Sequence, residues 1–196
     1  DALLASYTDA EQNAIVLEMR IHDDQIHLYM HLPDRTMVYD LEATKSLGQF
    51  IWFTLTTALV GYSRYQARGF VLFDGKWWFG DPVGGKFGYL SHDTSHQFGN
   101  PVRWEFGTQI VYGEGGSAII NEMELVALTG RVDVSKDPVI STIYSKDGQI
   151  WSSERSVKAG KIGQSVKRLV WLKAGNLGPC RVQRFRGTSD AHVSIS

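Results

Sequence analysis

The sequence predicts an all-β protein in two parts: antiparallel, propeller-blade-like meanders over residues 1–97, then a β-sandwich-like region over residues 98–196. Three observations predict this fold class. Short segments of alternating polar and apolar residues recur at about 10-residue spacing, as in sheet meanders. Gly, Pro, Asp and Asn separate these segments, as expected of turns. Aromatic residues make up 12% of the 196 residues and glycines number 20, a composition that favours strands and turns over helices.

The first part begins with a helix signal. Thr8 followed three residues later by Glu11 is the pattern of a capping box, in which the two residues satisfy free backbone donors at the start of a helix. We therefore expect a short helix from Asp9 to about Ile15, the only helix that the sequence indicates.

Residues 25–32 have the pattern of a strand with one buried face, because apolar and polar side chains alternate strictly. The polar face carries Gln25, His27, Tyr29 and His31. The apolar face, which we expect to be buried, carries Ile26, Leu28, Met30 and Leu32.

Turn residues place the other strands of the first part. Asp74-Gly75 lies between two aromatic segments and is the strongest short hairpin signal in the chain, because both residues tolerate positive φ. Further turns are expected at residues 33–35, 80–82 and 84–85. The strands between them are expected at residues 36–40, 50–55, 67–73, 76–79 and 86–90.

The second part begins where His, Gln, Gly, Asn and Pro cluster, at residues 95–102. Residues 113–116 separate two long strands, and residues 158–165 are expected to form a loop that contains Gly and Lys. The strands are expected at residues 102–112, 118–129, 139–144, 166–172, 180–186 and 191–195.

Composition excludes several classes of function. The formal net charge of −1 rules out an overall basic surface for nucleic acid, while local patches remain open. Cys180 is the only cysteine, so no intrachain disulfide can form. The sequence has no P-loop, dinucleotide fingerprint or Cys/His zinc spacing, so we expect no cofactor and no metal ion. Because structured sequence begins directly at Asp1, we expect the chain to be a fragment of a longer protein.

Two pairs of side chains resemble metal or catalytic sites. His27 and His31 share a strand face, but four residues of strand separate them by about 13 Å, too far for one ion. We interpret them as part of a solvated face. Glu122 and Glu124 share another face about 7 Å apart, as in some glycosidases. Without a third polar partner we interpret them as exposed strand residues, or as contacts to basic side chains of a neighbouring subunit.

Ser145, Asp147, Gly148 and Trp151 lie in a segment that resembles the Asp-box turn of sialidase-like propellers, one residue short of its spacing. We interpret it as a structural turn in which the Asp147 side chain holds the backbone. Together with the adjacent Trp77-Trp78, which could stack on a sugar, it leaves a carbohydrate-binding or sialidase-like β module as the alternative function.

Basic residues dominate residues 158–186, where acidic residues are nearly absent. With interleaved Trp171 and Phe185, this pattern is compatible with nucleic-acid contact, because attraction to phosphate needs no base reading. Solvated strand positions, or pairing with acidic groups of a protein partner, are the other interpretations. The candidate contact residues are Lys158, Lys161, Lys167, Arg168, Lys173, Arg181, Arg184 and Arg186.

An ordered series of motifs resembles one phage protein family. The first part carries Ser6-Tyr7-Thr8, His31-Leu32-Pro33, Val38-Tyr39-Asp40, Gly80-Asp81 and Gly88-Tyr89-Leu90. The last third carries Tyr144–Gly148 with Trp151, Arg168–Trp171, Leu177-Gly178, Arg184-Phe185-Arg186 and Ser189-Asp190. The series is similar to the packaged-DNA stabilisation, or tail hub, proteins of short-tailed phages. Each motif is weak alone, and their order over nearly the whole chain carries the resemblance.

The resemblance implies a structural protein of the virion tail and not an enzyme. Members of this family assemble as a ring of six copies beneath the portal, close the head after DNA packaging, and connect to the needle and spike proteins. The resemblance therefore implies a homo-oligomer, assembled in the cytoplasm of the bacterial host. Its partners would be the portal ring and the needle or spike, with contact to packaged DNA as a further expectation and no membrane contact.

Overall fold

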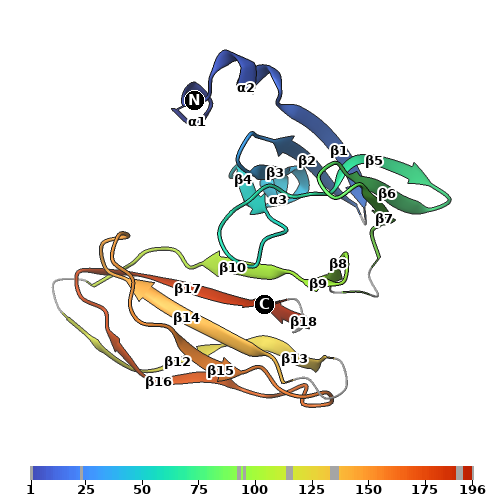
Figure 1. Ribbon diagram of the computed structural model, residues 1–196. Coiled ribbons are helices and arrows are strands. Elements are labelled where there is room, and N and C mark those ends of the chain that lie inside the picture. The colour runs from blue at the N-terminus through green and yellow to red at the C-terminus, as the bar shows by residue number, and fades with distance from the viewer. Residues whose placement is uncertain are drawn as a thin grey trace. The chain divides into compact units, whose positions relative to one another are not determined.

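In the computed structural model of the 196-residue chain, the described residues are 2–22, 24–91, 94, 96–113, 117–132, 137–188 and 192–195. The chain divides into two compact units, Asp1–Phe98 and Gly99–Ser196. Strands dominate both units, and the pairs that link the named strands are antiparallel (Figure 1). The all-β class that the sequence predicts is therefore confirmed. None of the helices among the described residues is long and apolar enough to cross a membrane.

The first unit contains two antiparallel sheets. Strands β1 to β4 form a four-stranded meander in sequence order, and β5, β6 and β7 form a three-stranded one. The elements of this unit are α1 (Ala2–Ala5), α2 (Asp9–Asn13), β1 (Val16–His22), β2 (Gln25–His31), β3 (Thr36–Asp40), α3 (Leu41–Leu47), β4 (Ile51–Leu55), β5 (Arg68–Phe73), β6 (Lys76–Asp81), β7 (Lys86–Tyr89) and β8 (His96–Gln97).

Helix α2 forms as the sequence predicts, but it is not the only helix. The Thr8 side chain accepts a hydrogen bond from Glu11 N, and the Glu11 carboxylate accepts one from Thr8 N at 2.9 Å, so the capping box is present. The expectation of a single helix is wrong, because α3 is capped at both ends. The Asp40 carboxylate accepts a hydrogen bond from Ala43 N, and Gly48 takes the left-handed conformation at φ 65°.

Strand β2 buries the face that we expected to be solvated. Tyr29 and His31 are buried, with His31 at 0% exposure, whereas Ile26, Leu28 and Met30 are only half-buried. Of the apolar face that we expected to be buried, only Leu32, just beyond the strand, is fully buried. The polar face is buried because residues of the neighbouring strands form hydrogen bonds with its side chains. The two ring nitrogens of His31 lie 3.2 Å from Thr36 Oγ1 and from Glu18 Oε2.

The β5–β6 hairpin confirms the Asp-Gly signal. Asp74 and Gly75 have φ values of 49° and 69°, which matches the turn that joins twisted strands through two residues. Val71 pairs with Trp78 and Phe73 with Lys76 on either side of it.

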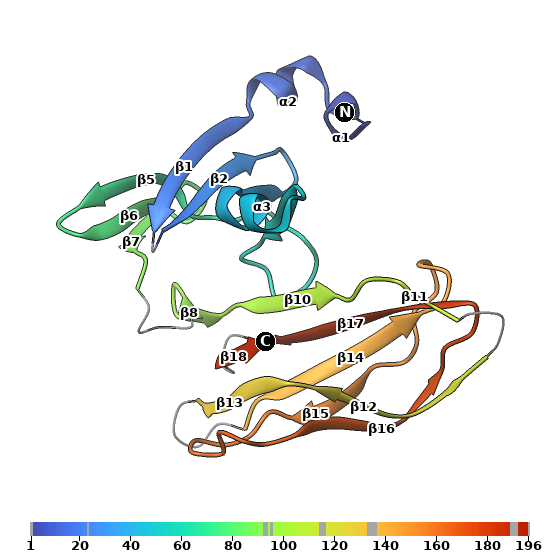
Figure 2. The ribbon, with the colours of Figure 1, turned by 180° about the vertical axis from the view of Figure 1, so that it is seen from behind.

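The second unit is a β-sandwich, as Figure 2 shows from behind. One layer has the strand order β10-β17-β14-β15, with β11 also pairing with β17. The other contains the pairs β12-β16 and β13-β18, in which only Val126 separates β12 from β13. The strands are β9 (Asn100–Pro101), β10 (Arg103–Gly107), β11 (Val111–Tyr112), β12 (Ile119–Leu125), β13 (Ala127–Arg131), β14 (Val139–Ser145), β15 (Arg155–Lys158), β16 (Leu169–Asn176), β17 (Cys180–Thr188) and β18 (His192–Ile195).

The core of the sandwich lies between these layers. Phe185 of β17 stacks on Phe106 of β10 at a centroid distance of 5.3 Å and meets Trp171 of β16 at 5.6 Å. Burial of such aromatic side chains supplies most of the apolar stabilisation of a sandwich. The buried residues of the cluster are Leu125, Ile140, Ala159, Leu169, Trp171 and Phe185.

Candidate functional site

The structure distributes the eight basic candidate residues over separate places in the second unit. Three lysines lie in or beside one loop, Arg168 lies against two glutamates, Lys173 lies in β16, two arginines lie on the outer face of β17, and Arg181 is buried. They do not form one continuous basic surface, so each group is considered by itself.

The loop from Lys158 to Lys167, here called the lysine loop, is held firmly against β13. Thr129 donates a hydrogen bond from Oγ1 to Gln164 O at 2.7 Å and accepts one from Lys167 N at 3.3 Å. Gln164 Oε1 in turn accepts a hydrogen bond from Lys161 N at 2.9 Å. Because Thr129 is buried, these bonds fix the backbone from which the lysines project.

Gly130 allows this close approach. Its φ is 79°, and a Cβ placed there would lie only 2.6 Å from the backbone carbon of Gln164. Gly163 N also donates a hydrogen bond to Gly130 O at 3.1 Å. A side chain at position 130 would push the lysine loop away from β13.

The lysine loop carries an excess of positive charge. Lys158 Nζ lies 3.0 Å from Asp137 Oδ2, and this contact, with weaker attraction from Lys161 and Lys167, lowers the pKa of the Asp137 carboxyl. Neither Lys161 nor Lys167 forms an ion pair with any residue in the described part of the chain. Three cations beside one carboxylate suit attraction to phosphate, which each lysine contacts as a point charge.

Arg168 is already engaged within the chain. Its guanidinium donates to Glu124 Oε1 at 2.9 Å and to Glu122 Oε1 at 2.9 Å, and these contacts raise its pKa. The two carboxylates therefore hold an arginine of their own chain, which explains their shared strand face without catalysis. Arg168 is a poor candidate for phosphate contact, because the two negative charges of the glutamates exceed its single positive charge.

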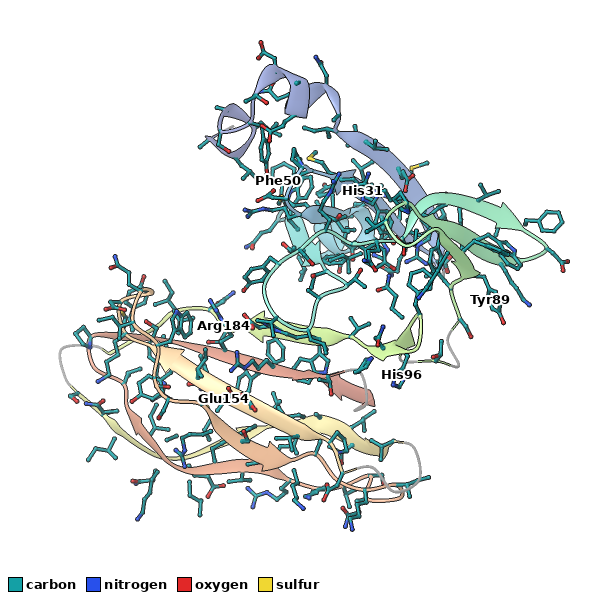
Figure 3. The ribbon with its side chains drawn as sticks, viewed as in Figure 1. His31, Phe50, Tyr89, His96, Glu154 and Arg184 are labelled. Carbon is teal, nitrogen blue, oxygen red and sulfur yellow. The ribbon has the colours of Figure 1, made fainter. Side chains whose placement is uncertain are left out.

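The outer face of β10 and β17, here called the charged face, carries alternating charges. Arg184 Nη1 lies 3.2 Å from Glu105 Oε1, and Glu105 also contacts Arg103. The Arg186 guanidinium donates from Nε to Glu154 Oε1 at 3.1 Å, and this contact lowers the pKa of Glu154 (Figure 3 labels Arg184 and Glu154). Because each arginine of the face already contacts a glutamate, the face favours contact with a protein of complementary pattern over contact with a polyanion.

The prediction that Arg181 contacts DNA or a partner protein is wrong, because its side chain is buried at 4% exposure. Its Nε and Nη2 both donate to Gln183 Oε1, at 3.0 and 2.7 Å, and its guanidinium lies 3.9 Å from the centre of the Tyr144 ring. Burial lowers the pKa of Arg181. The residue faces the interior because side chains alternate along β17, a parity that the basic composition alone does not reveal. Lys173 lies in β16 with a φ of 51°.

Asp147 closes a tight turn after β14. Its Oδ1 accepts hydrogen bonds from Gln149 N and Ile150 N, both at 2.8 Å, and from Ser145 Oγ at 2.9 Å. Gly148 has a φ of 75°, and Trp151 pairs with Ser145 in an isolated bridge. These bonds to ionised Asp147 lower its pKa. The turn also places the Trp151 ring 3.9 Å beneath the Arg184 guanidinium.

Trp77 and Trp78 do not form a common sugar platform. They are neighbours in β6 and therefore point to opposite faces of the sheet. The indole of Trp77 donates to Ile21 O at 3.0 Å, whereas Trp78 packs against Tyr89 at a centroid distance of 5.2 Å. The paired Trp residues, one of the two features that supported the carbohydrate-binding alternative, therefore do not offer a shared surface for a sugar.

Two family models match the chain, one for each unit. Residues 1–95 match the model described as bacteriophage P22 Gp10, beta-propeller, and residues 103–196 match the one described as bacteriophage P22 Gp10, beta-sandwich. Comparison with curated proteins found no match. The two matches follow the order of the two sheet systems along the chain.

Proposed function

The chain belongs to the bacteriophage P22 Gp10 family and is therefore a structural component of a phage virion, and from this premise we propose that it is a tail hub that closes the portal after DNA packaging. The observation that carries this proposal is that both halves of the chain match, in order, the two models named for one phage protein. A hub that acts by assembly needs complementary surfaces and no covalent chemistry.

The charged face supports the contact between subunits or with the portal. In a ring of six copies beneath the portal, its arginines and glutamates could exchange partners with charged residues of a neighbouring subunit. The needle or spike proteins would attach to the assembled ring, and assembly would take place in the cytoplasm of the bacterial host.

The lysine loop supports contact with packaged DNA. Its rigid backbone projects two lysines that have no ion-pair partner among the described residues, close to a third. Non-specific attraction to the phosphate backbone would retain DNA at the closed portal, and no base would need to be read.

Electron microscopy of the protein mixed with its cognate portal ring tests the proposal. We expect ring-shaped density that caps the portal, with the sandwich unit resolved well enough to place the lysine loop relative to the channel. A protein that stays monomeric and leaves the portal bare would refute the hub assignment. A variant with Arg184 and Arg186 both changed to Glu should lose the cap, whereas Lys45→Glu, on the exposed side of α3, should retain it.

A further inference from the structure

Three arginines gather where the two sheets of the first unit pack together. The ring of Tyr29 in β2 lies 5.1 Å from the ring of Phe70 in β5, measured between centroids, so the two sheets are in contact there. Arg20 lies in β1, Arg64 in the connection before β5, and Arg68 at the first position of β5. We call these three residues the arginine cluster. None of them forms an ion pair with any residue in the described part of the chain.

Backbone hydrogen bonds of the following residues hold two members of the cluster in place. Gly69, which follows Arg68, donates from its backbone N to Glu18 Oε1 at 2.7 Å. Tyr65, which follows the second arginine of the cluster, donates from its backbone N to Thr36 Oγ1 at 3.2 Å. Thr36 Oγ1 also contacts the buried histidine that pairs with Glu18. Both bonds therefore place an arginine beside the same carboxylate.

Arg20 reaches this place from β1. Glu18 and Arg20 lie two residues apart in the strand, so their side chains share one face of the sheet. Arg20 Nε donates a hydrogen bond to the Tyr29 hydroxyl at 2.9 Å, and Tyr29 lies opposite Glu18 in β2. Because Tyr29 is buried, this bond holds the Arg20 guanidinium close to the contact between the sheets.

Glu18 does not neutralise the arginine cluster. Its Oε1 accepts the bond from Gly69 N and its Oε2 lies 3.2 Å from His31 Nε2, so both oxygens already have partners (Figure 3 labels His31). The pKa of Arg68 is lowered, first by partial burial and then by repulsion from Arg64, and Glu18 only opposes this effect. Three cations beside one carboxylate leave two positive charges without a counter-charge among the described residues. An added anion would relieve the repulsion between them.

We propose that the arginine cluster binds a phosphate group with two negative charges. Guanidinium groups present planar forks of N–H donors that match the oxygens of phosphate. The two uncompensated charges equal those of a dianion, whereas a carboxylate side chain and a backbone phosphate of DNA each carry only one. The ligand is therefore free phosphate or a terminal phosphate monoester at the end of a nucleic acid strand. The site shares no residue with the lysine loop and does not rest on the hub function.

Isothermal titration calorimetry of the 196-residue chain with sodium phosphate tests the proposal. The titration is made at constant ionic strength in chloride, at a pH where phosphate is mostly dianionic. We expect saturable binding to one site, and sulfate, which also carries two charges, should compete for it. Arg64→Gln and Arg68→Gln should each weaken binding about tenfold, because each removes a charge-assisted contact. Arg64 is exposed, so Arg64→Gln separates the loss of charge from any loss of folding.

Arg35→Gln is the matched control. Arg35 also belongs to the first unit, but it already pairs with Asp34 at 2.6 Å, so its removal should leave phosphate binding unaltered. A loss in Arg35→Gln equal to that in Arg64→Gln would overturn the inference, because any positive charge would then serve. Binding that survives unchanged in both Arg64→Gln and Arg68→Gln would also overturn it.

Short single-stranded oligonucleotides distinguish the two sources of the phosphate. The same strand is titrated with a terminal phosphate and with a terminal hydroxyl. Tighter binding of the phosphorylated strand, lost in Arg64→Gln, would identify a strand end as the ligand, whereas saturable binding of inorganic phosphate alone would identify free phosphate. Equal binding of the two strands without saturable binding of inorganic phosphate, or no binding of any of the three, would overturn the inference. Portal protein is absent from these titrations, so their outcome is independent of the hub function.

Discussion

His31 Nε2 lies 3.2 Å from Glu18 Oε2, and His31 is completely buried. The same glutamate reaches the second sheet through its bond from Gly69 N, so one carboxylate joins a buried imidazole to a neighbouring blade. Burial lowers the pKa of His31 against the opposing pull of Glu18, and Arg64 and Arg68 lower it further. The folded protein therefore holds a neutral imidazole at this junction.

The first prediction is that the first unit loses stability on mild acidification. Because the folded pKa of His31 lies below its ordinary value of 6.5, the unfolded state takes up the proton first as the pH falls. Stability is complete above that value and declines as the pH falls from it toward the folded pKa, by at most about 1.4 kcal/mol per pH unit. Urea titrations followed by tryptophan fluorescence between about pH 7.5 and 5 measure this slope. His31→Gln should flatten it and the half-buried His27→Gln should not, and equal slopes in wild type and His31→Gln would contradict the assignment.

The second prediction concerns the contact between Gly130 and the lysine loop. Gly130→Ala should destabilise the protein by about 2 kcal/mol, because the new Cβ would meet the Gln164 backbone at 2.6 Å. Gly163→Ala is the matched control, since it also has positive φ, at 82°, but no atom within 4 Å of the added Cβ. It should lose only about 1 kcal/mol. Thermal unfolding of both variants, monitored by circular dichroism, compares them, and equal losses would mean that the close approach contributes nothing.

The third prediction separates a buried arginine from an exposed one on the same strand. Arg181→Lys should destabilise the sandwich by about 2 kcal/mol, because the single nitrogen of an ammonium cannot replace the two guanidinium nitrogens that converge on Gln183 Oε1 in this buried site. Arg184→Lys, on the charged face, should change stability by less than about 0.5 kcal/mol. Denaturant unfolding measures the change in unfolding free energy for both variants. An Arg181→Lys variant as stable as the wild type would show that the Gln183 contact is dispensable.

The fourth prediction tests DNA contact at the lysine loop. A variant with Lys158, Lys161 and Lys167 changed to Gln should bind duplex DNA more weakly and reduce the magnitude of the slope of log K against log salt by about 2 to 3. The control carries the same change in net charge at Lys45, Lys76 and Lys86 in the first unit. Fluorescence anisotropy at several salt concentrations gives both slopes. An unchanged slope in the lysine-loop variant, or an equal loss in the control, would remove this loop from DNA binding.

Sequence patterns predicted the elements whose signals are local in sequence. The Thr8 capping box and the Asp74-Gly75 hairpin were correct because each depends on residues close in sequence. Strand β1 was missed although Leu17, Met19 and Ile21 alternate with Glu18 and Arg20, a signal that was present in the sequence. Helix α3 was also missed, and its caps, Asp40 and Gly48, were the available signal.

The candidate site was harder to predict than the fold. The basic composition of residues 158–186 identified the lysine loop, but it could not separate Arg181, which points inward, from Arg184, which points outward. That difference depends on the register of β17 with β10 and β14, which is set by residues far away in sequence. The burial of His31 likewise depends on partners in β1 and β3 that no single strand pattern contains.

The position of β17 also determines when the sandwich can form during synthesis. Trp104 of β10 donates a hydrogen bond to Thr188 O, 84 residues later, and β10 finds its sheet partner only in β17 among the described strands. Pairing between residues so far apart in sequence is slow, and on the ribosome it must wait until β17 has left the exit tunnel. Until then the side chains of Trp104 and Phe106 lack the partner that covers them. The β10–β17 pairing therefore forms only after Thr188 has been synthesised.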